Sequence, residues 1–269
     1  MTKARAIGLF DSGLGGLTVA EEVFRQMPGE EVIYFGDTAH VPYGSKTEKE
    51  LIGFAHAIIG FLVQQGAKYV IFACNTSSSV SLGVMRRRYR VPMIGLVEPG
   101  VAAAVKATRN GRIGIIATEA TVRSGAYQRA FQAHRPGLRV FCQAAPLLVP
   151  LAEAGKVAAP EAERALKTYL APLRAAGIDT LVLGCTHYPF FAPLITNILG
   201  PEVVLVDPAV ATVAAAREDM ERRGMLQEAS ANPRHRFFVS GDAERFAVLA
   251  RNFVSRELAD VRQVCLLGG

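Results

Sequence analysis

Two cysteines occupy the same position in two similar segments of the chain. Residues 66–76 read GAKYVIFACNT and residues 177–187 read GIDTLVLGCTH, so each segment opens with Gly, continues through an apolar run typical of a strand, and ends in Cys and two polar residues. If the segments face each other, Cys74 and Cys185 lie on opposite sides of a bound ligand. One thiolate can then remove a proton from one face of a carbon while the opposing thiol protonates the other face. The pair therefore indicates inversion of a carbon stereocentre.

Other uses of these cysteines stay open at this point. Cysteine is common in protein cores, and a thiol at a strand end can act as a nucleophile. Cys74, Cys185 and His187 could bind zinc, although they lack close ligand spacing. A redox disulfide is disfavoured, because the two cysteines of such a pair are usually near in sequence. Cys142 and Cys265 have apolar neighbours, which predicts structural roles.

Polar groups that could assist a thiol lie near the ends of expected strands. Asp11 begins DSGLGG, where the glycines allow close approach of a ligand and a following helix favours an anion. His187 follows Cys185 by two residues and can exchange protons near neutral pH. Asp37, in the loop GDTAHVPYGSK, is either a helper base or a turn-capping residue. Because a free thiol has a pKa of about 8.5, such a neighbour or a helix N-terminus is needed to favour the thiolate.

Motifs for nucleotide cofactors and for disulfide frameworks are incomplete in this chain. DSGLGG does not have the GxGxxG spacing, no GxxxxGK[ST] occurs, and residues 44–47 (GSKT) resemble that pattern only in part. The four cysteines lie far apart without CxxC pairing, as in proteins that keep their thiols reduced.

Composition and charge limit the class of protein. The chain has 269 residues, 50% of them hydrophobic and 20% charged, which allows a large core. No apolar run approaches the ~18 residues of a membrane span, and the run before Asp11 is too short for a secretory signal. We therefore expect a cytoplasmic protein without a membrane partner. The net charge is +6, and the only dense cluster of basic residues is 85–90 (MRRRYR). We expect this cluster to be the exposed end of a helix and not a nucleic-acid site.

Short apolar runs alternate with longer helical segments. The alternation predicts βαβ units and mainly parallel sheets, which bind ligands beyond the carboxyl ends of their strands. The expected strands cover residues 4–11, 31–37, 69–74 and 91–97, and the expected helices cover residues 17–27, 46–66 and 78–89.

Three strand segments recur in the same order. RIGIIAT echoes RAIGLFD, GIDTLVLGCTH echoes GAKYVIFACNT, and PEVVLVDPA echoes VPMIGLVEPG. The repeat predicts an internal duplication into related α/β halves, with boundaries near Glu98-Pro99 and Asp207-Pro208. The remaining 60 residues are expected to form a helix, a strand (residues 236–242) and a helix, and could extend either half.

The motifs DSGLGG, GDTAHVPYGSK, FACNTSSS, GLVEPG and LGCTHYPF, in this order, resemble those of bacterial glutamate racemases, within the cofactor-independent aspartate/glutamate racemases. The resemblance implies two pseudo-symmetric α/β domains with mainly parallel sheets and an active site in the interdomain cleft. The first domain would comprise residues 1–97 plus 208–269, and the second residues 98–207. It also implies interconversion of L- and D-glutamate without cofactor or metal, supply of D-glutamate to peptidoglycan, and a homodimer.

The resemblance also assigns roles to individual residues. Cys74 would deprotonate D-glutamate with help from Asp11, and Cys185 would deprotonate L-glutamate with help from His187. Asp37 and Glu153 are further helper candidates. The residues expected to bind the ammonium and carboxylate groups of the substrate are Asp11, Ser12, Tyr43, Gly44, Asn75, Thr76, Thr118, Thr121, Thr186 and His187.

Two alternative functions remain compatible with the sequence. The chain could racemise or isomerise aspartate or another dicarboxylate with the same thiols. It could instead be a non-catalytic protein that holds an anion at the DSGLGG turn, which would leave the paired cysteines unexplained.

Overall fold

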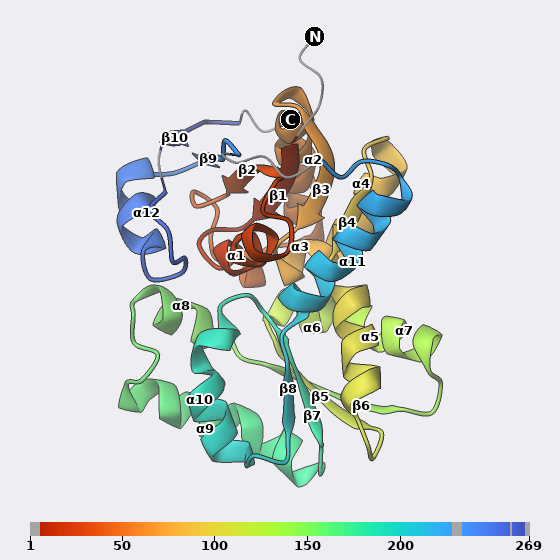
Figure 1. Ribbon diagram of the computed structural model, residues 1–269. Coiled ribbons are helices and arrows are strands. Elements are labelled where there is room, and N and C mark those ends of the chain that lie inside the picture. The colour runs from red at the N-terminus through yellow and green to blue at the C-terminus, as the bar shows by residue number, and fades with distance from the viewer. Residues whose placement is uncertain (1–5, 228–232, 259, 267–269) are drawn as a thin grey trace.

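The computed structural model describes residues 6–227, 233–258 and 260–266. Residues 1–5, 228–232, 259 and 267–269 of the expected first domain lie outside the described residues. Two sheets are stacked end to end in Figure 1, a six-stranded sheet with the order β10-β9-β2-β1-β3-β4 above a four-stranded sheet with the order β6-β5-β7-β8. All strand pairings are parallel, which confirms the predicted fold class. The strands are β1 (Ala6–Asp11), β2 (Glu31–Gly36), β3 (Ala67–Phe72), β4 (Met93–Gly95), β5 (Arg112–Ala117), β6 (Arg139–Ala144), β7 (Thr180–Gly184), β8 (Val204–Val206), β9 (Arg236–Val239) and β10 (Val261–Gln263).

Four strands are arranged in the same order in both sheets. β6-β5-β7-β8 repeats the order β2-β1-β3-β4, so β5, β7 and β8 take the places of β1, β3 and β4, as the three sequence matches predict. β6 takes the place of β2 without a recognisable sequence match. β2 is central and almost fully buried, whereas β6 lies at a sheet edge and is half-buried, so the two strands are under different constraints on composition.

The last part of the chain extends the six-stranded sheet. β9, the strand expected from residues 236–242, pairs with β2, and β10 pairs with β9. β10 was not predicted, because its sequence, VRQ, is short and mostly polar. The strands before residue 97 and after residue 208 therefore share one sheet, which supports the proposed domain boundaries; the boundaries themselves stay a prediction.

Helices cover both sheets. α2 (Glu48–Gln64) begins at a capping box formed by Thr47 and Glu50 and buries one apolar stripe, as its periodicity predicts. The single helix expected over residues 78–89 is instead divided into α3 (Asn75–Val80) and α4 (Leu82–Arg88). The break lies at Ser81, whose hydroxyl donates to the Leu51 carbonyl oxygen at 3.0 Å.

Among the described residues, no helix is long and apolar enough to cross a membrane. Arg87 and Arg88 lie exposed at the end of α4, as expected for the basic run. The other helices are α1 (Leu17–Gln26), α5 (Val97–Ala107), α6 (Glu119–Ser124), α7 (Ala126–His134), α8 (Leu148–Glu153), α9 (Pro160–Ala175), α10 (Ala192–Leu199), α11 (Pro208–Arg222) and α12 (Ala243–Ala250), with 3₁₀ turns η1 (Tyr43–Ser45) and η2 (Tyr188–Phe191).

The chain passes between the halves at α5 and α11. α5 follows β4 of the first sheet but packs against β7 and β8 of the second, and α11 follows β8 and packs against α1 in the first half. The two helices also pack against each other (Figure 1). At this crossing a Cβ atom on Gly100 would lie 3.0 Å from Cβ and Cγ of Pro208, so a larger residue fits only if the two helices shift slightly.

We expect Gly100→Ala to lower the free energy of unfolding by about 1–3 kcal/mol, because the rigid proline ring cannot move aside and the two helices must separate. Gly53→Ala is the matched control, since Gly53 is also helical and an added Cβ would meet nothing within 4 Å. The control should raise the free energy of unfolding by about 0.5–1 kcal/mol. Chemical denaturation followed by circular dichroism measures both changes, and a loss of equal size in the two variants would contradict the close contact.

Candidate active site

A cavity of about 100 Å³ lies between the two halves. Its walls come from segments that follow β1, β3, β5 and β7, the carboxyl ends at which parallel sheets bind ligands. Most of the site residues expected from the sequence line this cavity, namely Ser12, Tyr43, Gly44, Cys74, Asn75, Thr76, Thr118, Glu153, Cys185, Thr186 and His187.

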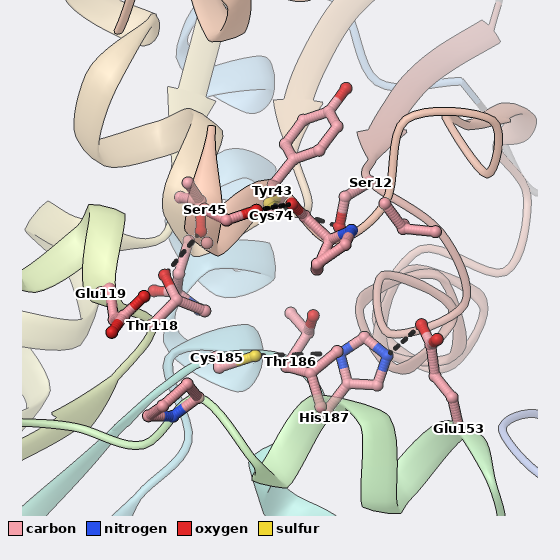
Figure 2. A pocket seen from close by; sticks show the side chains of 17 residues that line it. Ser12, Tyr43, Ser45, Cys74, Thr118, Glu119, Glu153, Cys185, Thr186 and His187 are labelled. Carbon is pink, nitrogen blue, oxygen red and sulfur yellow. Dashed lines mark hydrogen bonds and ion pairs between the residues drawn. The ribbon is translucent and has the colours of Figure 1, made fainter. Parts of the chain in front are cut away.

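The two cysteines lie on opposite sides of the cavity. Figure 2 shows Cys74 at the upper wall, with Ser12 and Tyr43, and Cys185 at the lower wall, with Thr186 and His187. Both cysteines are buried and both are free thiols. The two strand ends therefore present one sulfur atom each to the same small space.

Cys74 lies in an environment that disfavours a thiolate. Burial raises its pKa to about 11, with the charge of Asp11 adding to the effect and the Ser77 backbone N–H opposing it. The Sγ atom of Cys74 lies 3.8 Å from Oγ of Ser12. In the free protein at neutral pH, Cys74 is therefore a thiol.

Asp11 lies behind this thiol and does not line the cavity. Its Oδ2 atom accepts the N–H groups of Gly13 and Gly16, both at 2.9 Å. Its Oδ1 atom is buried without a hydrogen-bond partner among the described residues. Burial raises the pKa of Asp11, and the nearby His187 opposes that rise. The carboxylate thus keeps one oxygen atom free to accept a proton.

Cys185 lies next to a charged pair. Its Sγ atom is 3.8 Å from Nδ1 of His187, and Nε2 of His187 is 3.2 Å from Oε1 of Glu153. The second contact has an ion-pair distance without hydrogen-bond geometry. Burial lowers the pKa of His187, but its contacts with Cys185 and Glu153 outweigh that effect and raise the pKa to about 10. His187 is therefore protonated at neutral pH.

His187 is held from the first half of the protein. A Cβ atom on Gly15 would lie 2.6 Å from Nδ1 of His187 and 2.5 Å from Oγ1 of Thr186, so only a glycine allows this approach. The ring of Phe253, which follows α12, meets the His187 ring edge to face at 5.9 Å. The imidazole ring is thus enclosed by backbone and by an aromatic ring that both belong to the first half.

Threonine hydroxyls connect the halves at one wall of the cavity. Oγ1 of Thr118 lies 2.9 Å from Oγ1 of Thr76 and 2.9 Å from Oγ1 of Thr121. Thr121 does not line the cavity; it supports the two threonines that do. Nearby, Asn75 accepts a hydrogen bond from the Tyr127 hydroxyl at 2.6 Å, while its Nδ2 atom has no partner among the described residues. That amide is available to a ligand.

Residues 12–216 match the Asp/Glu/hydantoin racemase family. The chain belongs to this family. It is 59% identical to a glutamate racemase of Desulforudis audaxviator, over 97% of this chain and 98% of that protein, and 43% identical to one of Geobacter metallireducens, over 97% of each. The family membership confirms the resemblance seen in the motifs and makes the chain a racemase, an isomerase.

Solved structures of glutamate racemases have the same fold as this racemase. The structure from Bacillus anthracis matches with a TM-score of 0.94 at 35% identity, covering 98% of both chains. A glutamate racemase from Francisella tularensis in complex with D-glutamate matches with a TM-score of 0.92 at 32% identity, again covering 98% of both chains. Among the described residues of this racemase, no group of three or more His, Cys, Asp or Glu could hold a metal ion, so the structure offers no support for the zinc alternative.

Asp37 lies outside the cavity of the racemase. Its Oδ2 atom accepts the Tyr43 hydroxyl at 2.5 Å, and its Oδ1 atom lies 2.8 Å from Nδ1 of His40 and accepts the Ser240 hydroxyl at 2.7 Å. These contacts tie the loop that carries Tyr43 to the segment after β9. Of the two roles open for Asp37 in the sequence, the geometry favours the positioning of this loop over direct proton transfer.

Some cavity residues were not predicted. Ser45 directly follows Gly44 in the loop GDTAHVPYGSK and Glu119 directly follows Thr118, so closeness to predicted residues was the available signal. Pro146 and Val149 follow β6, the strand without a recognisable repeat, so no pattern pointed to them. Val41 and Pro42 complete the lining.

The charge on His187 can be measured directly. We expect the imidazole of the racemase to titrate with a pKa of about 10 and Glu153→Gln to lower that pKa by about one unit or more. Histidine nitrogen NMR across the pH range measures both values. Glu161→Gln, which removes an exposed carboxylate on α9 outside the cavity, is the control and should leave the titration unchanged.

The titration of His187 also determines how the free energy of unfolding changes with pH. The pKa of His187 is raised in the folded protein above its ordinary value of 6.5, so its stabilising contribution is complete below pH 6.5 and is lost as the pH rises through about 10. Denaturation of the racemase should show this loss, and His187→Gln should remove that part of the pH dependence. A His187 ring that is neutral at pH 8 would contradict both expectations.

Proposed function

We propose that this racemase interconverts L- and D-glutamate by a two-base mechanism with Cys74 and Cys185. The observation that carries the proposal is the pair of free thiols on opposite walls of one small cavity, each at the end of an equivalent strand. The choice of glutamate is supported by relatives at up to 59% identity that are glutamate racemases, and by the similar fold of a glutamate racemase in complex with D-glutamate.

In the direction from D- to L-glutamate, Cys74 removes the Cα proton and Cys185 protonates the opposite face. Cys74 must first lose its own proton, and Asp11, with one buried oxygen atom free, is the group that can accept it. The substrate ammonium group, brought into a buried cavity, would further stabilise the thiolate. The electron pair left on Cα is delocalised into the α-carboxylate until the Cys185 thiol supplies a proton.

In the direction from L- to D-glutamate the roles are exchanged. Cys185 removes the Cα proton, and Cys74 protonates the other face. The charged His187 ring beside Cys185 balances negative charge on that sulfur, and Glu153 holds the ring in its charged form. At each stage the reaction needs one thiolate and one thiol, so the two sulfurs titrate as a coupled pair.

The remaining cavity residues would hold the substrate. Hydroxyl groups of Ser12, Thr118 and Thr186 and the free amide of Asn75 line the space on both sides of the two sulfurs. Their mixture of donors suits the two carboxylates of glutamate. Tyr43 and Gly44, Thr76 and Thr121 would complete or support this shell, as the resemblance implies.

The wider setting of the enzyme is part of the same proposal. We place it in the cytoplasm as a homodimer that supplies D-glutamate for peptidoglycan, with residues 1–97 plus 208–269 and residues 98–207 as its domains. A racemase for aspartate or another dicarboxylate would use the same thiols, and a panel of enantiomers distinguishes the two readings. Membership of a racemase family argues against the non-catalytic anion-binding alternative.

Incubation with either enantiomer of glutamate in D2O should bring both to the same mixture, with solvent deuterium at Cα. Cys74→Ser and Cys185→Ser should each slow this reaction by about 10³-fold or more, since a serine hydroxyl is a far weaker base than a thiolate. Cys142→Ser is the matched control, because Cys142 lies on β6 outside the cavity, and should keep full activity.

Circular dichroism measures the approach of either enantiomer to the common mixture, and NMR measures the entry of deuterium at Cα. Racemisation that survives either cavity-cysteine substitution would refute the two-base mechanism. Racemisation of aspartate in preference to glutamate would refute the choice of substrate.

A further inference from the structure

A second pocket, of about 260 Å³, lies next to the catalytic cavity and is also formed by both halves of the protein. Its polar lining comprises Lys46, Glu48 and Ser79 from the first half and Arg123, Ser124 and Arg129 from the second half. None of these residues takes part in the proposed reaction. Lys46 belongs to the GSKT segment, which resembles a phosphate-binding motif only in part.

The two arginines of this pocket lack anionic partners. Among the residues that the structure describes, neither Arg123 nor Arg129 forms an ion pair; Arg123 donates to the Lys46 carbonyl oxygen at 3.4 Å and Arg129 to that of Ser124 at 2.8 Å. Lys46 has one long ion pair, with Nζ 4.0 Å from Oε1 of Glu50, and the other oxygen of that carboxylate is held by Thr47. The two arginines are therefore free to bind an anion, and Lys46 is held only by its long contact with Glu50.

A buried hydroxyl group adds a donor to the same pocket. The Oγ atom of Ser79 is buried and has no hydrogen-bond partner among the described residues. A buried polar atom of this kind costs free energy unless a ligand or water satisfies it. Leu51, Val80 and Ala120 form the apolar part of the lining, which leaves room for a small organic group beside an anion.

We infer that this pocket binds a phosphate-class dianion that bridges the two halves, through Lys46 and Ser79 on one side and Arg123 and Arg129 on the other. Arginine and lysine side chains are the usual protein ligands of phosphate oxygen atoms. The lining holds three cationic residues and one carboxylate, Glu48, and Glu50 outside the lining offsets part of the charge of Lys46, so positive charge remains in excess. Free phosphate and a small phosphomonoester share this chemistry.

The pocket shares its walls with the catalytic cavity. α3 contributes Thr76 to the cavity and Ser79 to the pocket. α6 directly follows Thr118, which lines the cavity, and carries Arg123, which lines the pocket. The turn η1 lines the cavity and leads directly into Lys46. α3 and α6 meet where the two halves meet in Figure 1. An anion that holds these segments together therefore favours the arrangement that encloses glutamate, and glutamate in turn strengthens binding of the anion.

Binding is tested by calorimetric titration of the full chain with inorganic phosphate at constant ionic strength. We expect one saturable site per chain with a Kd of about 1 mM or lower, and an Arg123→Gln/Arg129→Gln double variant should weaken binding by about tenfold or more. Arg87→Gln, which removes an exposed positive charge on α4 outside the pocket, is the control and should bind as the unaltered chain does. The same titration with glycerol phosphate distinguishes free phosphate from a phosphomonoester as the ligand. A phosphomonoester whose organic group occupies the apolar lining should bind more tightly than inorganic phosphate.

Absence of saturable binding for both probes, or equal Kd values for the double variant and the unaltered chain, would overturn the site. Far-UV circular dichroism verifies that the double variant is folded. The effect on catalysis rests on the proposed function and is measured separately, as a fall of about fivefold in the KM for glutamate at saturating phosphate. If phosphate binds but the KM for glutamate does not change, the coupling between the two sites is refuted and the phosphate site is not. If the protein fails to turn over glutamate without phosphate, the proposed function is refuted and the phosphate site is not.

Discussion

Two equivalent strand ends face each other across one small cavity, and this arrangement constrains the rest of the molecule. Cys74 follows the end of β3 by two residues and Cys185 directly follows β7, so both sulfurs can line one cavity only if the two sheets present their carboxyl ends to each other. A duplicated sheet meets this requirement directly, because equivalent strands end in equivalent places. The crossing of α5 and α11 then brings the halves together at a contact so close that a Cβ atom on Gly100 would lie 3.0 Å from the ring of Pro208.

The two sides of the cavity carry the same thiol in different surroundings. Cys74 lies beside a buried carboxylate, whereas Cys185 lies beside a charged imidazole that a second carboxylate supports. The equivalent strands therefore lead into the same residue type, while the groups that lie beside each thiol differ in charge and come from different segments of the chain.

Much of this arrangement could be predicted from the sequence, and the exceptions have physical causes. Strand ends can be predicted from the sequence because a buried apolar run stops at a polar residue. This pattern pointed to Cys74, Cys185 and most of their neighbours as candidate site residues. β6 was not found because an edge strand needs less apolar sequence than a buried one. Glu119 and Val149 were missed because packing, and not local pattern, decides whether a side chain turns toward the cavity. Thr121 and Asp37, predicted as site residues, lie outside the cavity lining, and sequence spacing does not show that each instead contacts a cavity residue from behind.

The approach of Gly15 to Thr186 and His187 has a mechanical consequence. A methyl group at position 15 would lie within 2.7 Å of the Thr186 hydroxyl oxygen and of two atoms of the His187 ring, so those side chains or the second half itself would have to move. Gly15 does not line the cavity, yet the distance between the cavity walls depends on the absence of that methyl group. The width of the cavity is thus set in part by a residue outside its lining.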